Sequence, residues 1–386
     1  MDYNYLSKST EIYNQHKSKI LERFQQRAQA YQEQILIDSK NITPRFKELM
    51  ADLYYFLNTH KKILDAEESQ LPTLPYEVRK KFCKELLDYY GQIFKNQMTH
   101  YANEVEKVCQ DFSTQEHFAH KLYFQEILLE LYVLQCPFTK RAYQKPHGYA
   151  GDFILMNMIA EDDPFTGNSF YQKCLQYFTV NSPSAAPVRN RITLIYNELC
   201  KKAAEVLKQR DEFRLFDVAS GPSLPIQWFL QRNDESNNLN GFFLDQDSLS
   251  IDYLQNRLNL YKERFRRQSR FRYSTKKIQE VLMDQGMLRE LADQDFIFSS
   301  GLFDYLSDDL AKMLIQALYA LLSPGGCLLI GNLSDRSTGK VFQWYVNDWP
   351  IFFRTEAQIK SLAPQGVKIE ILKEELGFNL FIKIIK

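Results

Sequence analysis

From residue 213 onward, short apolar runs alternate with longer amphipathic stretches, and this alternation constrains the fold more than any other feature. The runs RLFDV, GFFLD, FIFSS and GCLLIGN have the length and composition of strands buried on both faces of a sheet. Amphipathic segments at 248–261 and 308–322 lie between such runs and have helical spacing. The end of the chain, VKIEILKEELGFNLFIKIIK, predicts an antiparallel hairpin around Gly377. This order predicts a doubly wound α/β domain.

The part of the chain before this domain has a different pattern, with helical periodicity and almost no glycine. Between residues 10 and 133, apolar residues recur at helical spacing. We predict one helix in 76–112, beginning just after Pro75, and another in 115–134. The irregular segments KPHGYAGDF (145–153) and NSPSAAP (181–187) interrupt the helices. We therefore expect an all-helical domain at 1–180 and an α/β domain at 181–386.

Composition restricts the class of protein and of partner. The 386 residues include 48 basic and 48 acidic side chains, so the formal net charge is zero. A balanced charge gives no electrostatic reason to expect nucleic acid as a partner. Six scattered cysteines without paired spacing predict reduced, mostly buried thiols in a soluble cytoplasmic protein. We find no apolar signal core and no apolar run of about eighteen residues, so no membrane-spanning helix is expected.

The turn after the first strand is the strongest candidate for a ligand site. Asp217 ends the strand, and a helix begins near Ser223. Between them lie the small residues Ala219, Ser220 and Gly221, which let a ligand lie against the turn backbone. The N-terminus of the helix can donate backbone N–H groups to the same ligand. An ordinary connection between a strand and a helix is the alternative interpretation.

The second strand ends in another carboxylate, which suits a ribose. Asp245 can accept hydrogen bonds from both ribose hydroxyls, and Gln246 lies beside it. Ser300, Gly301 and Leu302 follow the fourth strand, and we predict that they line the same site. A dinucleotide needs the room that a GxGxxG turn gives its pyrophosphate, and this turn has a single glycine. The pattern therefore favours an adenosine cofactor other than a dinucleotide.

The same turn resembles the DxGxGxG turn of Rossmann-like S-adenosylmethionine (SAM) methyltransferases. Asp217 and Gly221 match that turn, while Ala219 and Ser223 replace its outer glycines. SPGGCLLIGN (323–332) resembles the PGG turn that leads into the fifth strand of those enzymes. The resemblance implies a seven-stranded domain with an antiparallel last strand and with SAM as the cofactor.

Three further segments resemble a narrower family, the bacterial methyltransferases of the extracellular-factor (3-hydroxypalmitic acid methyl ester) biosynthesis type. They are KPHGYAGDF, VRNRI (188–192) and GNLSDRSTGKVFQWYVNDWPIFFRT (331–355). The resemblance covers about residues 135 to 386. It implies methyl transfer to a carboxylate or hydroxyl oxygen of a small, fatty acid-like acceptor.

The resemblance also suggests residues for the acceptor side. Tyr149 and Asp152 belong to the KPxGYxGD segment of that family, and we predict that they serve the acceptor or a lid over the cofactor. His147 occupies the variable position of the segment and is a further candidate, as a general base. Asp348 and Trp349 match a DW pair after the fifth strand. The alternatives are a turn whose Asp152 caps the next helix, and a Trp349 that only packs in the core.

Other residues leave two interpretations open. Arg189 and Arg191 can pair with a carboxylate of the acceptor or of SAM, or they can form surface ion pairs. His117 and His120 have the spacing of some metal ligands, but no further ligands complete a site, so no metal is expected. The basic stretch 262–272 favours a solvated face over an anion site. The many aromatic residues favour core packing over an apolar acceptor channel.

An active SAM-dependent O-methyltransferase is the leading hypothesis, and two other classes compete with it. The replaced glycines at Ala219 and Ser223 suggest a non-catalytic SAM-binding or interaction protein. A nicotinamide-dependent oxidoreductase is disfavoured by the single glycine of the turn. We expect the helical domain to form a lid, an acceptor site or the interface of a homodimer.

Overall fold

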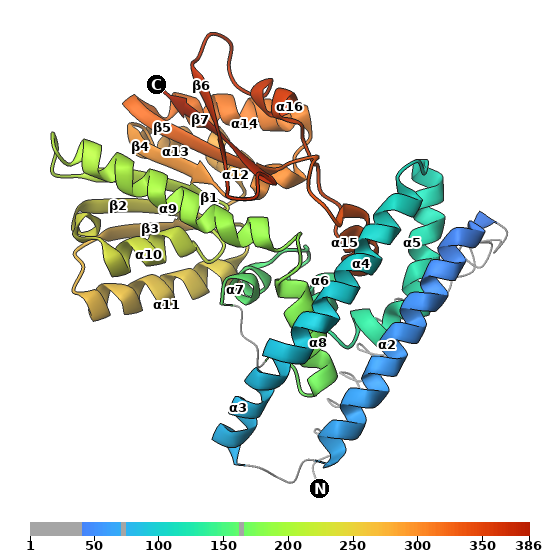
Figure 1. Cartoon of the computed structure of the whole chain (residues 1–386). Helices are drawn as coiled ribbons and strands as arrows, with labels where there is room; N and C mark the ends of the chain where they lie inside the picture. The colour runs from blue at the N-terminus through green and yellow to red at the C-terminus, as the bar shows by residue number, and fades with distance from the viewer. Residues whose placement is uncertain (1–40, 71–74, 162–165) are drawn as a thin grey trace, which may run out of the picture.

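The computed structural model describes residues 41–70, 75–161 and 166–386. It consists of a sheet with helices on both faces and a group of helices beside it (Figure 1). The N-terminal part of the described chain lies in the helical group, and the sheet is built from residues 213–385. The helical pattern predicted between 10 and 40 lies outside the described residues. The predicted fold class, an all-helical part followed by an α/β part, is confirmed.

The sheet has seven strands in the order β3-β2-β1-β4-β5-β7-β6. Strands β1 to β5 are parallel, whereas β7 is antiparallel to both β5 and β6. The predicted terminal hairpin and antiparallel last strand are therefore confirmed. The strands are β1 (Phe213–Val218), β2 (Leu239–Leu244), β3 (Arg270–Ser274), β4 (Gln294–Ser299), β5 (Leu322–Leu333), β6 (Ile369–Lys373) and β7 (Asn379–Ile385).

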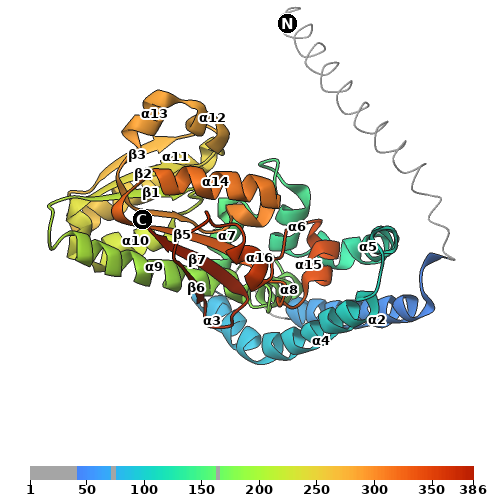
Figure 2. The same ribbon diagram turned by 90° about the horizontal axis from the view of Figure 1, so that it is seen from above.

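Helices cover both faces of the sheet because its central strands carry apolar side chains on both sides. In β1, Phe213 and Leu215 pack on one face, and Phe216 and Val218 pack on the other. Helices α9 to α11 cover the first face, and α12, α13, α14 and α16 cover the second. Figure 2 shows α9 and α10 on one side of the sheet and α12 to α14 on the other. These helices are α9 (Ala186–Val206), α10 (Leu224–Arg232), α11 (Ser248–Phe265), α12 (Ile278–Met283), α13 (Gln285–Glu290), α14 (Asp308–Ala320) and α16 (Glu356–Lys360).

The helical group follows the periodicity read from the sequence. The helix predicted in 76–112 is α3 and α4 joined by a π-helical turn, and it begins directly after Pro75. The helix predicted in 115–134 is α5, which a second π-helical turn continues. The helices are α2 (Pro44–Gln70), α3 (Tyr76–Leu86), α4 (Gln92–Cys109), α5 (Thr114–Leu128), α6 (Pro137–Gln144), α7 (Phe153–Glu161) and α8 (Phe170–Val180), with π turns at Leu87–Gly91 and Leu129–Val133.

A helix from the C-terminal half completes the core of the helical group. Helix α15 (Lys340–Asn347) follows β5 and places Phe342, Tyr345 and Val346 in the same buried cluster as α2, α4 and α8. Figure 1 shows α15 next to α4 and α5, away from the sheet. The break between α8 and α9 coincides with the predicted boundary at 180. The division into two domains stays a prediction, and α15 connects the two parts.

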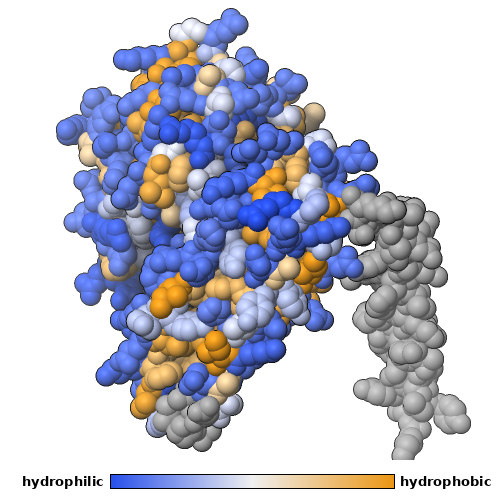
Figure 3. Space-filling view, turned by 45° about the vertical axis from the view of Figure 1, so that its right-hand side comes forward, coloured by the Kyte–Doolittle hydropathy of each residue, from blue (hydrophilic) through white to orange (hydrophobic). Residues whose placement is uncertain are grey.

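The surface of the described residues is mixed in character. On the face seen in Figure 3, hydrophobic residues lie in separate patches between hydrophilic ones. All six cysteines are free, and five of them are buried, as the scattered spacing predicts. No helix among the described residues is long and apolar enough to cross a membrane.

Candidate cofactor and acceptor site

A cavity of about 510 Å³ lies between the carboxyl ends of the parallel strands and the helical group. One part of it, which we call the sheet end, is lined by residues 218–225, 244–246, 276, 278, 279 and 300–302. The other part, the helical end, is lined by side chains of the helical group and of α15, among them Ala102, Tyr132, Phe138, Phe178 and Phe342. Both ends belong to one cavity, so a ligand at the sheet end can meet a second one in the helical end.

Nine of the ten predicted cofactor residues line the sheet end of this cavity. The tenth, Asp217, lies buried beneath the turn after β1, where its Oδ2 accepts a hydrogen bond from Ser223 Oγ at 2.5 Å. The nine that line the cavity are Ala219, Ser220, Gly221, Ser223, Asp245, Gln246, Ser300, Gly301 and Leu302. The fold therefore brings together the three segments that the sequence places after β1, β2 and β4.

The turn after β1 keeps a glycine-like backbone although two of its expected glycines are missing. Ala219, Gly221 and Ser223 have φ angles of 57°, 51° and 45°, in the left-handed region. A residue with a Cβ is disfavoured there by about 1–2 kcal/mol, so the surrounding structure holds Ala219 and Ser223 in place. The hydrogen bond from Ser223 to Asp217 contributes to this. Ala219 and Ser223 therefore adopt the backbone conformation that glycine adopts most easily.

Asp245 connects the turn to the loop after β2. Its Oδ2 accepts hydrogen bonds from Gly221 N at 2.8 Å and from Ser250 Oγ at 3.3 Å, and its Oδ1 accepts one from Asp247 N at 3.0 Å. The side chain is 7% exposed and lines the cavity, and burial raises its pKa. Oδ1 can accept a further hydrogen bond, for example from a ribose hydroxyl.

The burial of Asp217 predicts that the stability of the protein depends on pH. Burial raises the pKa of Asp217 from 3.8 to about 8, and the nearby Asp245 contributes to the rise. Between these two values the native state keeps a proton that the unfolded chain has released. Stability therefore falls as pH rises through this window, by at most about 1.4 kcal/mol per pH unit from this one group. Above pH 8, Asp217 is ionised in both the native and the unfolded state, so this group causes no further loss of stability.

The Asp217→Asn variant is therefore expected to be more stable than the unaltered chain at pH 8. Its free energy of unfolding should also lack the decrease with rising pH that Asp217 causes. Asparagine is neutral throughout and can still accept the Ser223 hydrogen bond. Urea unfolding at a series of pH values from 4 to 8 measures the effect. Asp304 also has a raised pKa, but it is present in both proteins and cancels in the comparison. If the free energy of unfolding changed with pH in the same way in both proteins, the raised pKa of Asp217 would be contradicted.

Segment 145–153 packs on the loop between β2 and α11. Asp247, the N-cap of α11, accepts hydrogen bonds at Oδ2 from His147 Nδ1 at 2.5 Å and from Tyr149 OH at 3.2 Å. Its Oδ1 accepts a hydrogen bond from Leu249 N at 3.0 Å. Tyr149 lines the cavity, and burial raises its pKa. The segment therefore forms part of the cavity wall near the predicted ribose carboxylate, and its role as a lid stays a prediction.

The contacts of His147 and Asp152 are structural ones. Arg141 NH2 donates to His147 Nε2 at 3.0 Å, and a guanidinium cannot accept, so the ring proton lies on Nδ1 and points to Asp247. Asp152 is buried, forms an ion pair with Arg141 at 2.8 Å and accepts from the backbone N–H groups of Ile154 and Leu155. These bonds cap α7, which is the alternative that the sequence leaves open for Asp152. The catalytic role of both residues stays a prediction, and these contacts do not support it.

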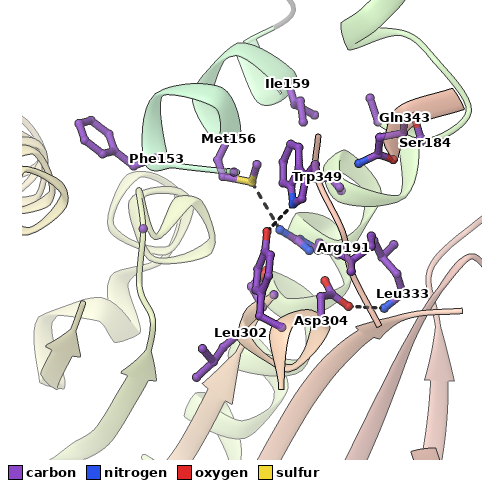
Figure 4. A pocket seen from close by; sticks show the side chains of 18 of the residues that line it. Phe153, Met156, Ile159, Ser184, Arg191, Leu302, Asp304, Leu333, Gln343 and Trp349 are labelled. Atoms are coloured by element: carbon purple, nitrogen blue, oxygen red, sulfur yellow. Dashed lines mark hydrogen bonds between the residues drawn. The ribbon is translucent and has the colours of Figure 1, made fainter. Parts of the chain in front are cut away.

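The predicted DW pair holds segment 145–153 from its other side. Trp349 packs against Gly151, and its Nε1 donates to Tyr305 OH at 2.8 Å (Figure 4). Asp348 forms ion pairs with Lys121 and Lys145, and Lys145 also donates to the Asp348 carbonyl at 2.7 Å. The pair thus fastens the chain after α15 to both the helical group and the segment.

Arg191 is a buried cation beside the cavity, whereas Arg189 is not part of the site. Arg189 donates to the carbonyls of Ile159 and Val180, both at 2.8 Å. The Arg191 guanidinium lies against Gly301 and within 3.6 Å of Met156 Sδ, and it points into the cavity in Figure 4. Arg191 forms no ion pair within 4.0 Å among the described residues, although the charge of Asp304 acts on it from a longer distance. Burial lowers its pKa, and the charge of Asp304 offsets this only in part, so the position favours an anionic partner from outside the chain.

Asp304 is a carboxylate that no motif in the sequence singles out. It lies in the short 3₁₀ helix Leu302–Tyr305, lines the cavity and accepts a hydrogen bond at Oδ1 from Leu333 N at 2.7 Å (Figure 4). Burial raises its pKa to about 6, against the opposing effect of the Arg191 charge. Asp247 and Asp304 could not be found by motif, because each of them acts through contacts with residues distant in sequence.

The remaining candidates have structural surroundings. His117 bonds to Tyr345 OH and His120 to the Glu116 carbonyl, and no group of three or more potential metal ligands occurs in the described ranges. In the basic stretch, Arg267, Arg270 and Arg272 form ion pairs with acidic side chains. A solvated, paired face is therefore what the structure shows there.

Comparison with known proteins finds distant structural likenesses. No protein-family model and no curated protein match the chain. A "possible exported protein" of Bordetella parapertussis is 14% identical, with 77% of this chain and 96% of that chain covered and a TM-score of 0.45. A putative methyltransferase of Thermobifida fusca is 13% identical, with coverages of 60% and 92% and a TM-score of 0.43.

A third similar structure is magnesium protoporphyrin IX methyltransferase of Synechocystis with bound SAM. It is 11% identical, with 53% of this chain and 84% of that chain covered and a TM-score of 0.37. The fold is a Rossmann-like sheet of seven strands. Likenesses this distant carry no assignment of activity, so the function has to be argued from the residues of the cavity.

Proposed function

We propose that the protein is a SAM-dependent methyltransferase that methylates an oxygen of a small, apolar acceptor, a carboxylate in the first place. The observation that carries the proposal is one continuous cavity. Its sheet end has the left-handed turn at 219–223 and the carboxylate of Asp245, and its helical end is largely apolar. A non-catalytic SAM-binding protein would need the first end alone.

The sheet end fits an adenosine with a short polar extension. Asp245 is placed to accept from the ribose hydroxyls, and apolar side chains such as Leu244, Ile278 and Phe298 line a slot for a purine. Ala219 and Ser223 leave the turn backbone accessible to the methionine part. The cofactor would supply an electrophilic methyl group on its sulfonium. The turn has no second glycine to make room for a pyrophosphate, and this disfavours a dinucleotide.

The helical end fits an acceptor with an anionic head and an apolar body. Arg191 lies where the sheet end and the helical end meet, and it can hold a carboxylate by charge-assisted hydrogen bonds. A carboxylate is ionised at neutral pH, so it needs no general base for attack on a methyl group. The work of the protein is then to align that oxygen and to exclude water, which segment 145–153 and Trp349 do by closing the cavity.

Calorimetric titration with SAM, its demethylated product S-adenosylhomocysteine (SAH), and NAD tests the cofactor. Micromolar binding of SAM and SAH without binding of NAD is expected. A screen of carboxylic acids with SAM, read by mass spectrometry, then tests methylation. Binding of SAH without methylation of any acid would favour the non-catalytic alternative, and absence of SAM and SAH binding would exclude both.

Asp245→Asn is expected to weaken SAH binding about tenfold or more. The variant keeps the shape of the side chain but replaces one acceptor oxygen by a donor, so one ribose hydroxyl loses its partner. Asp252→Asn, on the exposed side of α11, makes the same chemical change and should leave the affinity unchanged. Calorimetry with SAH measures both variants. Equal affinities would remove Asp245 from the cofactor site.

A further inference from the structure

Asp304 is a buried carboxylate in the wall of the cavity that the proposed reaction does not yet use. The residue is 4% exposed, and its Oδ1 accepts a hydrogen bond from Leu333 N at 2.7 Å. No described residue donates to Oδ2, and Oδ2 is not one of the polar atoms that the protein encloses completely. Figure 4 shows this second oxygen turned away from Leu333, on the side of Arg191. Because Asp304 lines the cavity, the free oxygen is open to a ligand there.

Two cations and one phenol face Asp304 from the elements packed around it. Arg191 of α9 acts on it by its charge, but the two side chains form no ion pair within 4.0 Å. Arg354, in the segment before α16, also acts on it, and its guanidinium already pairs with Asp308 at 2.9 Å. Tyr305 is neutral, since burial raises the pKa of its hydroxyl. Arg191 is therefore the cation that Asp304 and an acceptor carboxylate would have to share.

An acceptor carboxylate held by Arg191 would bring a second negative charge close to Asp304. Two carboxylates in one buried site cannot both stay ionised at low cost, so one of them takes up a proton. Asp304 is the one predisposed to do so, because burial has already raised its pKa to about 6. An ordinary aliphatic carboxyl group titrates near pH 4 and keeps its negative charge.

We propose that Asp304 is a positioning residue, which binds the acceptor in its protonated form and donates a hydrogen bond from Oδ2 to one oxygen of the acceptor carboxylate. This inference rests on the proposed function and adds a residue that orients the acceptor. The other carboxylate oxygen is left for the methyl group. A carbon–oxygen bond forms there as the carbon–sulfur bond of the sulfonium breaks, and the electron pair of that bond stays on sulfur. Asp304 takes its proton from solvent on binding and returns it when the neutral ester leaves.

Calorimetry of the SAH-loaded full chain with octanoic acid, in buffers of different ionisation enthalpy, tests the proposal. An observed enthalpy that depends on the buffer reports proton uptake, and up to one proton per bound acid is expected at pH 7.5. The protonated fraction of Asp304 in the free protein falls from about half at pH 6 to about 1% at pH 8. The affinity for the acid should therefore fall about 50-fold between these two pH values.

Asp304→Asn should remove both the proton uptake and the decrease in affinity. Its amide oxygen can still accept from Leu333 N, and its amide nitrogen can donate to the acceptor without a proton from solvent. At pH 8 the variant should bind octanoic acid at least about tenfold tighter than the unaltered chain. Asp308→Asn is the matched control, because Asp308 is half-exposed and pairs with Arg354 instead of lining the cavity. It should keep both effects, and thermal melts establish that each variant is folded.

The proposal is overturned if octanoic acid binds without proton uptake, a result that the unaltered chain gives even if Asp304→Asn does not fold. It is also overturned if the pH dependence survives in Asp304→Asn. Tighter binding of 2-aminooctanoic acid without proton uptake would contradict it as well, and would show an ionised Asp304 that pairs with an ammonium group. If SAH or every acid failed to bind, no heat of binding would be seen, and the proposed function would be rejected together with this inference.

Discussion

Replacing Gly151 by alanine is expected to lower the rate of methylation about 100-fold and to destabilise the protein by about 2–4 kcal/mol. A Cβ at this position would lie 2.3 Å from Cζ2 of Trp349 and 2.9 Å from Tyr305 OH. The indole ring is rigid, and its bond to Tyr305 holds it in place. Gly151 also has a φ angle of 79°, which alanine adopts only with strain.

The segment must therefore move when Gly151 is replaced, and it carries Tyr149 along the cavity wall. A displacement of about 1 Å in a positioning element can reduce a rate about 100-fold. Turnover with SAM and a methylated acid, together with urea unfolding, measures both effects. The rate effect is expected to exceed any change in SAH affinity, because the ribose carboxylate lies on another loop.

Gly148→Ala separates backbone strain from the clash with Trp349. Gly148 has a φ angle of 85°, close to that of Gly151, but a Cβ there would meet no atom within 4 Å. Only the strain of about 1–2 kcal/mol is expected, with little effect on the rate. If the two variants lost the same stability and the same activity, the contact between Trp349 and Gly151 would not be what positions the segment.

Arg191→Met is expected to weaken binding of the acceptor acid about 100-fold. The guanidinium is buried and forms no ion pair within 4.0 Å among the described residues, so removing its charge removes a desolvation penalty. It also removes the charge that stabilises ionised Asp304, so the two effects on stability oppose each other. The lost interaction is a charge-assisted one, with a net contribution of about 1.5–3 kcal/mol. Calorimetry of the SAH-loaded protein with a carboxylic acid and a thermal melt of the free protein measure the two quantities.

Arg189→Met is the control for this prediction, because Arg189 bonds to backbone carbonyls instead of lining the cavity. It should lower the melting temperature and leave acid binding intact. Unchanged acid affinity in Arg191→Met would show that the acceptor carboxylate lies elsewhere. A loss of SAM affinity with unchanged SAH-loaded acid binding would assign Arg191 to the carboxylate of the cofactor.

The strands and the cofactor turn can be read from the sequence because local pattern decides them. Apolar runs such as GFFLD bury both faces wherever they lie in the sheet, and parallel strands bring their carboxyl ends to one edge. The sequence pattern alone therefore places Asp217, Gly221 and Asp245 together. The hairpin around Gly377 follows from two short apolar runs separated by a turn.

The acceptor side depends on contacts between residues far apart in sequence, and only the tertiary structure decides these. His147 meets Asp247, and Lys145 meets Asp348, across 100 and 203 residues. Arg189 and Arg191 are two positions apart in the sequence but have different surroundings. Arg189 donates to backbone carbonyls, whereas Arg191 is buried and forms no ion pair with the described residues. No sequence pattern indicates that the amide oxygen of Asn347 is buried without a hydrogen-bond partner among the described residues. Hydrogen-bond partners and desolvation are properties of three-dimensional surroundings, whereas strand and turn formation depend mainly on neighbours along the chain.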